Sequence, residues 1–395
     1  MPWEPLTDEQ LEVRELVRTL ARERIALRAA EIDASREFPW DVVELFREHE
    51  LFGLLVEERY GGSGTGMLLA LVAIEEISKV CATSGLILAV QELGSLGLKV
   101  AGTEEQKKRF LPRIATGEWL VAYALTEAGS GSDSAAMRTT ARREGDGYLL
   151  DGSKRFITNA GVASLYTVFA KTDPDAGHSG ISAFVVDADT PGFDVTRLEP
   201  KMGIAGSTTG ELVFDGAHVP AANLLGAEGD GFKIAMRILD RSRPGVAAQG
   251  LGIAQGATDY ALEYARTRET MGKPIAEHQL IAAKLADMET RCEAARGLLY
   301  RFGRMVDEGA PDADLTKASA MAKLACTDAA MWVTTEAVQI LGGYGYVKEY
   351  PLERMMRDAK ITQIYEGTNE VQRLVIAREM LRESRPGALL GARDH

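Results

Sequence analysis

Cysteine and histidine are scarce in this chain of 395 residues. The three cysteines (Cys81, Cys292 and Cys326) lie far apart, which argues against a disulfide framework and favours a reducing compartment. The five histidines include no i,i+4 pair, and no Cys-x-x-Cys motif is present. We therefore expect a protein of the cytoplasm that holds no zinc or iron.

Clustered positive charge and long apolar runs are also missing. The net charge is −13, whereas recognition of nucleic-acid phosphates depends on clustered Lys and Arg. No apolar stretch approaches the ~18 residues that span a bilayer. The first residues carry Glu4, Asp8 and Glu9, unlike a secretory signal. These observations predict no nucleic-acid partner and no membrane insertion.

The usual nucleotide-binding loops are absent as well. No strand leads into Gly-x-Gly-x-x-Gly, and no Walker loop is present. A Rossmann or P-loop nucleotide site is therefore not indicated. The glycine clusters lie elsewhere, within residues 129–133 and 342–345.

The pattern along the chain predicts three parts in the order α–β–α. Residues 1–122 read as helical, and Thr7 with Gln10 forms a capping box before the first apolar face. Residues 123–228 alternate in the manner of strands, with the pairs Asp146-Gly147 and Asp151-Gly152 as expected turns. Residues 229–395 return to long amphipathic helices, which pack as a bundle. The fold class is therefore α+β.

One candidate ligand-binding segment lies at the boundary between the helical part and the sheet, over residues 123–133. Its small residues would let a planar ligand approach the backbone, and the hydroxyls of Thr126 and Ser132 add polar contacts. The alternative is a Ser/Gly/Asp loop that satisfies its own turn. The residues alone favour that alternative.

A second candidate is the carboxylate of Glu366. Gly367 breaks the helical pattern there, and Asn369 with Gln372 is expected to cap a new helix. A general base needs a partly dry pocket that raises its pKa, while a helix N-terminus would lower it. The sequence leaves this balance open, and a solvated acid at a helix start is the simpler reading.

A third candidate is the segment that contains Asp240 and Arg243. These two residues are i,i+3 neighbours, which is typical of an ordinary surface ion pair. Pro244 is expected to distort the helix, which would instead expose polar groups to a ligand.

Together these segments resemble the acyl-CoA dehydrogenase family from about residue 5 to residue 383. Residues 123–133, 154–159, 268–272, 337–343 and 357–368 match motifs of the family in the family's order. The resemblance implies an N-terminal helical domain, a central β domain and a C-terminal four-helix bundle. It also implies FAD as cofactor and a homotetramer arranged as a dimer of dimers.

The resemblance further assigns site residues. The flavin ring would be held by Tyr123, Leu125, Thr126, Gly131, Ser132, Phe156, Ile157 and Thr158. The diphosphate and adenosine, largely of the neighbouring subunit's FAD, would be held by Arg268, Thr270, Gln279, Gln339 and Gly343, while Thr368 and Glu370 would lie near the cofactor. Ser132, Asp240, Arg243 and Gly367 would contact the acyl-CoA.

By the same resemblance, Glu366 is the base. It would take the α-proton of the thioester while the β-hydrogen leaves as hydride to the flavin, giving a trans-2-enoyl-CoA. In one branch of the family the base stands at the position of Ser242, which cannot serve. Phe156 stands where many members have Trp, and Met271 where Phe is common.

The resemblance also implies an electron-transferring flavoprotein as the electron acceptor. The overall look is that of short-chain and short branched-chain members. Two alternatives are weighed against a dehydrogenase: an acyl-CoA oxidase that passes electrons to oxygen, and a non-catalytic helical assembly protein of the same fold. The length of 395 residues weighs against the oxidase, and the presence of Glu366, Arg268 and Thr126 together weighs against the assembly protein.

Overall fold

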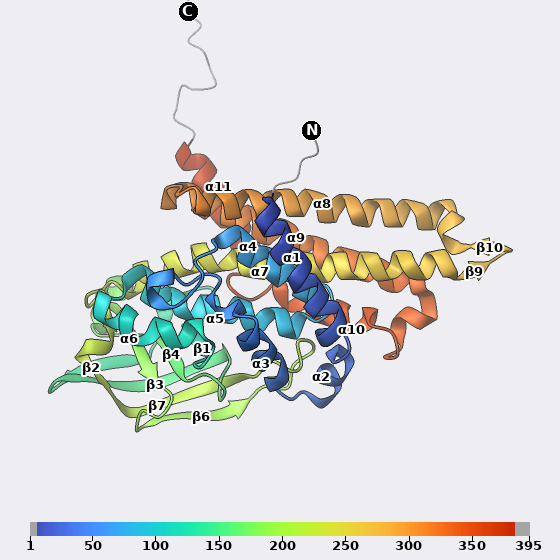
Figure 1. Cartoon of the computed structure of the whole chain (residues 1–395). Coiled ribbons are helices and arrows are strands. Elements are labelled where there is room, and N and C mark those ends of the chain that lie inside the picture. Colours follow the sequence, from blue (N-terminus) through green and yellow to red (C-terminus); the bar gives the residue numbers. More distant parts are fainter. Residues whose placement is uncertain (1–5, 384–395) are drawn as a thin grey trace, which may run out of the picture.

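The computed structural model describes residues 6–383, in which helices, then a sheet, then helices follow one another along the chain. In Figure 1 the sheet lies at the lower edge of the view, with the helices above it. The predicted α–β–α order is thereby confirmed. The N-terminal helices are α1 (Asp8–Leu20), α2 (Ala29–Ser35), α3 (Trp40–Glu48), α4 (Met67–Ser78), α5 (Ala82–Ala101) and α6 (Glu104–Ala115), with a π-helical turn (Ala21–Ile25) after α1. The capping box of Thr7 and Gln10 is present at the start of α1.

Helix α5 corrects one expectation from the sequence. It has the length and hydropathy of a membrane-spanning helix, although we expected no such stretch. However, 78% of that window is buried inside the fold, where α5 packs against α4, α7 and strand β1 (Val121–Ala124). Its apolar character therefore serves the protein core.

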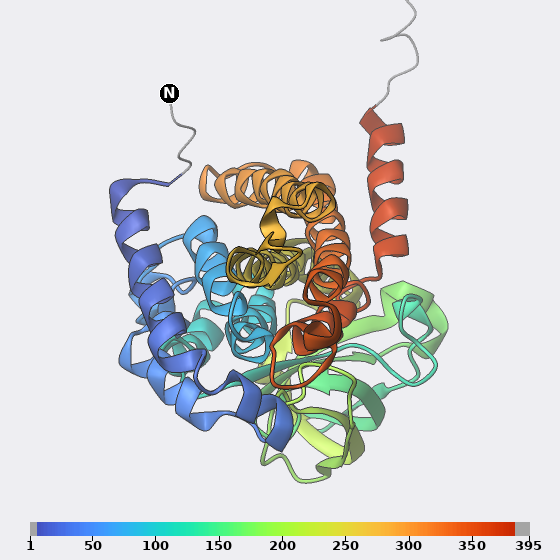
Figure 2. The same cartoon turned by 90° about the vertical axis from the view of Figure 1, so that its right-hand side faces the viewer.

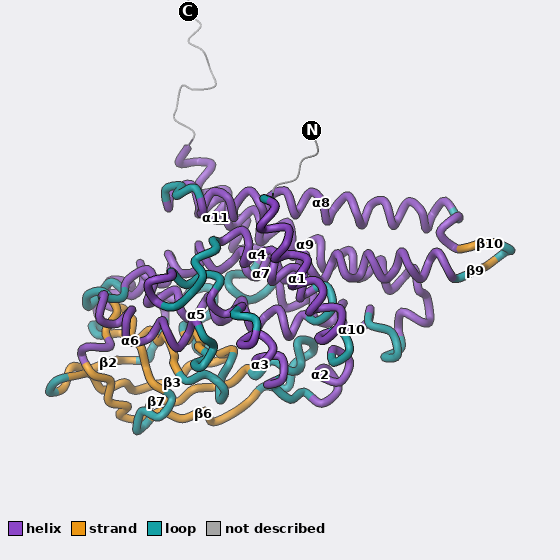
Figure 3. The backbone as a smooth tube through the Cα atoms, in the orientation of Figure 1, coloured by secondary structure: helices purple, strands orange, loops and turns teal. Residues whose placement is uncertain are grey.

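The central part is a mostly antiparallel sheet in the order β6-β7-β3-β2-β4-β5-β8, with β1 added parallel to β4 (Figure 3). Its further strands are β2 (Thr140–Glu144), β3 (Gly147–Thr158), β4 (Leu165–Lys171), β5 (Ile181–Asp187), β6 (Phe193–Leu198), β7 (Thr209–Pro220) and β8 (Leu224–Leu225). The expected turn at Asp151-Gly152 is wrong. Gly152, at φ 140°, lies inside β3, where the register against β7 shifts as in a β-bulge.

The C-terminal part consists of long helices beside one another (Figure 2). They are α7 (Gly231–Thr267), α8 (Gln279–Asp307), α9 (Asp312–Leu341), α10 (Leu352–Thr362) and α11 (Asn369–Glu383), and a hairpin of β9 (Glu269–Thr270) and β10 (Lys273–Pro274) joins α7 to α8. Pro244 lies inside α7, and the helix continues on both sides of it from Gly231 to Thr267.

Helix α7 connects all three parts. It packs on α4 and α5 of the N-terminal part, on β5 of the sheet, and on α8, α9 and α10 of the bundle. Residues of its first half therefore face both the sheet domain and the loop between α10 and α11. That loop contains Glu366.

Candidate active site

The loop of Glu366 is a tight connection between α10 and α11. The backbone N–H of Asn369 donates to the Gln363 carbonyl at 3.0 Å, which closes the loop. Glu366 and Gly367 both have positive φ, 54° and 93°, and such a conformation is uncommon for a residue other than glycine. Strain of this kind at a carboxylate is typical of a functional position.

The cap of α11 differs from our expectation. Helix α11 starts at Asn369, and Thr368 precedes it with its hydroxyl accepting from the Val371 N–H at 3.3 Å. Thr368 is therefore the cap. The side chain of Asn369 is buried against α9 instead, and exposed Glu370 lies in the first turn of α11.

The carboxylate of Glu366 is partly buried and faces α7. The hydroxyl of Ser242 donates to its Oε2 at 2.6 Å. Burial raises the pKa of Glu366, while the Ser242 hydrogen bond and the positive charges of Lys323 and Arg243 oppose the rise. The pKa remains above its ordinary value, so the balance that the sequence left open is decided by burial.

Arg243 lies beside the same carboxylate. Its guanidinium is buried and donates to Asp240 Oδ1 at 2.7 Å, which confirms the i,i+3 pair, but its Nε has no hydrogen-bond partner among the described residues. Gly367 has a φ of 93°, which L side chains rarely adopt, so a larger residue would be strained there. The structure thus brings Asp240, Arg243, Glu366 and Gly367 together.

Tyr123 of β1 closes this group from the side of the sheet. Its hydroxyl is buried without a partner in the described part of the chain, and its ring packs edge-on against Phe169. Burial and the nearby charge of Glu366 raise the pKa of Tyr123. The strand that leads into the glycine-rich segment therefore ends beside the candidate base.

A buried ion pair holds the glycine-rich segment in place. Lys154 Nζ lies 2.8 Å from Glu127 Oε1, and the same carboxylate accepts the backbone N–H groups of Arg138 and Thr139. Burial lowers the pKa of Lys154 to about 8. The Arg155 N–H donates to the Thr126 carbonyl at 2.8 Å, which joins this segment to β3. Glu127 is a residue whose organising role the sequence did not reveal.

The segments around Thr126 and Phe156 fit the ring of FAD. Phe156 is 58% exposed and, at φ 59°, turns its ring outward at the end of β3. Gly131 has open space where a side chain would stand, as does Gly129, so a planar group can approach the backbone. Of the other predicted flavin residues, Leu125 and Ile157 are buried, Thr126 and Thr158 are half-buried, and Ser132 is exposed.

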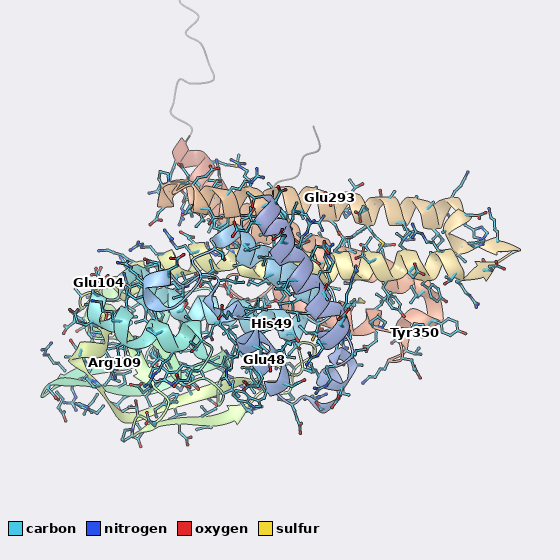
Figure 4. The ribbon with its side chains drawn as sticks, in the orientation of Figure 1. Glu48, His49, Glu104, Arg109, Glu293 and Tyr350 are labelled. Carbon is cyan, nitrogen blue, oxygen red and sulfur yellow. The ribbon has the colours of Figure 1, made fainter. Side chains whose placement is uncertain are left out.

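The predicted diphosphate and adenosine residues gather at the far end of the bundle. Arg268, Thr270, Gln279, Gln339 and Gly343 are all exposed there. Arg268 stacks over the Tyr344 ring at 5.7 Å, and Tyr344 contacts the ring of Tyr350, which is labelled in Figure 4. Arg243 and Arg268 are separated by 25 positions of one continuous helix, a distance of about 37 Å. The chain does not bring this cluster to its own Glu366.

Two further observations complete the site. Lys323 and Asn369 form a buried hydrogen bond close to Glu366, and nothing in the sequence pattern pointed to Lys323. Among residues 6–383 no group of three or more His, Cys, Asp or Glu side chains is arranged to hold a metal ion.

Comparison with known proteins yields matches over nearly the whole chain. Family models described as the N-terminal, middle and C-terminal domains of acyl-CoA dehydrogenase match residues 7–118, 122–217 and 229–381. An acyl-CoA dehydrogenase of Bacillus subtilis is 49% identical over 95% of this chain and 99% of its own length. A short-chain specific acyl-CoA dehydrogenase of Clostridium acetobutylicum is 46% identical over 95% of this chain and 99% of its own length.

Two solved structures also match nearly the whole of this chain. Butyryl-CoA dehydrogenase from Megasphaera elsdenii superposes with a TM-score of 0.93 at 45% identity, covering 97% of this chain and 100% of its own. A chain from work on the electron transferring flavoprotein of Acidaminococcus fermentans superposes with a TM-score of 0.94 at 45% identity, covering 97% and 100%.

Proposed function

The chain belongs to the acyl-CoA dehydrogenase family, and we propose that Glu366 is the base of its reaction. The activity is the FAD-dependent dehydrogenation of acyl-CoA thioesters. FAD, when bound, supplies the acceptor for the hydride that leaves the β-carbon. The residues of this chain bind and orient the thioester and remove its α-proton.

The observation that carries the proposal is the environment of Glu366. Its carboxylate is held by Ser242 in a strained loop, and burial raises its pKa toward working pH. A carboxylate whose pKa is raised by burial is a stronger base than a solvated one. Arg243 beside it contributes the positive charge that stabilises negative charge in the site.

The FAD site follows from the two residue groups described above. Thr126, Ser132, Phe156 and Thr158 would hold the flavin ring of the chain's own site. The exposed cluster that contains Arg268 is about 37 Å away along α7, so it would serve the diphosphate and adenosine in a neighbouring subunit. This distance supports an oligomer whose subunits share FAD sites, and by the family resemblance we propose a homotetramer arranged as a dimer of dimers. Sedimentation equilibrium tests it against the chain mass of 42.8 kDa.

We infer the preferred acyl-chain length and the electron acceptor from the relatives named above. The short-chain specific relative and butyryl-CoA dehydrogenase favour short acyl groups and a role in fatty-acid degradation. The similarity to the chain studied with an electron transferring flavoprotein favours such a flavoprotein as electron acceptor. Three buried cysteines with free thiols are in keeping with a cytoplasmic protein.

The experiment is anaerobic reduction of the bound flavin by acyl-CoA thioesters of different length and branching. We expect Glu366→Gln to remain yellow and to bind the thioester, because a neutral amide keeps the shape of the side chain. Its rate of flavin reduction should fall by roughly 10²–10⁴-fold, the usual contribution of a general base. Reduction of this variant at the normal rate would end the assignment.

The matched control is Glu293→Gln, which removes the same charge from the outer face of α8, where Glu293 is labelled in Figure 4. This variant should reduce its flavin at the wild-type rate. Admitting air to the reduced enzyme separates the oxidase alternative, since an oxidase would form peroxide rapidly. Protein that stays colourless after FAD is supplied would favour the non-catalytic alternative.

A further inference from the structure

Lys323 of α9 is a lysine in an unusual place. Its side chain is fully buried in the bundle, and its Nζ donates to Asn369 Oδ1 at 2.8 Å. It forms no ion pair with any residue of the described range 6–383. Buried ammonium groups are rarely left without a bonded carboxylate, because desolvation of the charge is costly.

Helix α9 presents two more polar residues to the same asparagine. The Asn369 Nδ2 donates to Asp328 Oδ1 at 2.7 Å and lies 2.9 Å from Thr327 Oγ1. Asp328 Oδ1 also accepts from Gln363 Nε2 at 2.7 Å. Gln363 and Asn369 are the two residues whose backbones close the loop of Glu366. One turn of α9 therefore holds both ends of that loop.

Few polar or charged side chains face Glu366. Ser242 and Arg243 come from α7, Lys323 from α9, and the tyrosine hydroxyl of Tyr123 from β1, with Tyr365 adjacent in the chain. Arg243 is also paired with Asp240, at 2.7 Å.

The acids around Lys323 are engaged elsewhere or lie in solvent. Asp328 is paired with Arg373 at 2.8 Å, and Glu370 is exposed. Glu366 exerts a stronger charge interaction on Lys323 than Arg243, Asp328 or Glu370 does. Among the described residues, Lys323 is thus the cation near Glu366 that has no carboxylate bonded to it.

We propose that Lys323 is a positioning residue for the base: it holds the Glu366 loop through Asn369, and its buried positive charge keeps the Glu366 carboxylate ionised. The proposal rests on Glu366 being the base. It deepens that assignment by naming the group that sets the protonation state of the base.

The two buried groups act on each other in opposite directions. Burial raises the pKa of Glu366 and lowers the pKa of Lys323 to about 7, and each charge opposes the shift of the other. Below pH 7 Lys323 is charged and favours the carboxylate of Glu366. The positive charge of Lys323 is therefore present on the acidic side, where Glu366 tends to take up a proton, and it fades as the pH rises above 7.

The test is the pH profile of kcat/KM, whose acid limb reports the pKa of the base in the free enzyme. We expect Lys323→Met to move the acid limb to higher pH by about 1–3 units, the size of the effect of a neighbouring opposite charge. Lys323→Arg keeps the charge and should leave the limb within about half a unit of wild type, below that range. An unmoved limb in Lys323→Met, or a limb displaced by a full unit in Lys323→Arg, overturns the proposal.

Two more variants separate charge from structure. Asn369→Ala breaks the contact to the loop but keeps the lysine, so it should lower kcat/KM at every pH without raising the limb by a unit. Lys233→Met removes a surface charge from α7, where the side chain is 80% exposed, and should leave the profile unchanged. If Lys323→Met does not fold, Lys323→Gln replaces it as the uncharged variant and is judged by the same acid limb.

Glu366→Gln is measured alongside these variants. If it retains the wild-type rate, the proposed base itself is wrong. If it is inactive and Lys323→Met leaves the limb in place, only the role of Lys323 is wrong.

Discussion

Replacing Ser242 by alanine removes the side-chain hydroxyl that, among the described residues, bonds the candidate base. The Ser242 Oγ donates to Glu366 Oε2 at 2.6 Å, and this bond favours the charged form of the carboxylate. Its loss therefore raises the pKa of Glu366 further. Hydrogen bonds to charged groups contribute about 1.5–3 kcal/mol, and one pKa unit corresponds to about 1.4 kcal/mol. We expect a rise of about one to two units.

The assay is kcat/KM for a short acyl-CoA, measured against pH with an artificial electron acceptor. A base whose pKa rises is protonated over more of the acidic range, so the acid limb moves to higher pH. Below the wild-type limb the variant should be about 10- to 100-fold slower. At pH values well above both limbs, the two enzymes should converge, because Glu366 is ionised in each.

The control is Ser319→Ala on α9. Ser319 is also buried in the bundle, but its hydroxyl has no partner in the described residues. This variant should keep the wild-type limb. A Ser242→Ala enzyme that holds its FAD and shows the same limb as Ser319→Ala would refute the reasoning, since the hydrogen bond would then have no effect on the base.

Two predictions concern stability. Burial raises the pKa of Asp358 from 3.8 to about 6, so between these pH values the folded state binds more protons than the unfolded state does. The free energy of unfolding therefore falls as the pH rises through this range. Asp358→Asn keeps an acceptor for the Ile204 N–H. Relative to wild type, its free energy of unfolding should be almost unchanged at pH 4 and higher by up to about 3 kcal/mol above pH 6. Tm measured against pH at fixed protein concentration checks this, and a gain that is largest at pH 4 contradicts it. Tyr123→Phe removes a buried hydroxyl that has no partner among the described residues. The Tm of this variant should therefore be unchanged or higher. A fall in Tm equivalent to more than about 1 kcal/mol would mean that the hydroxyl is bonded in solution.

The sequence predicted the features that depend on near neighbours in the chain. The capping box of Thr7 and Gln10 and the pair of Asp240 with Arg243 each join residues three positions apart, and both are present. The α–β–α order was also predictable, because the spacing of apolar residues differs between helices and strands. The resemblance to the family selected Glu366 as the candidate base, although the residues by themselves favoured a solvated acid.

Local patterns failed where packing overrode them. Asp151-Gly152 has the residues of a turn but lies in a bulge inside β3, because β7 pairs on both sides of it. Pro244 has the character of a helix breaker but lies within α7. Helix α7 packs against α4, α5 and α9, and such tertiary contacts stabilise a helix that a proline weakens.

The chemistry of the site was decided by the tertiary structure. Ser242 and Glu366 are 124 positions apart, and Lys323 and Asn369 are 46 apart, so no local pattern relates them. Whether Glu366 is solvated or has a raised pKa depends on the burial produced when α7 and α9 pack around its loop. The sequence determined which groups are available and which helices carry them. Their distances, and therefore their proton affinities, exist only once those helices are packed together.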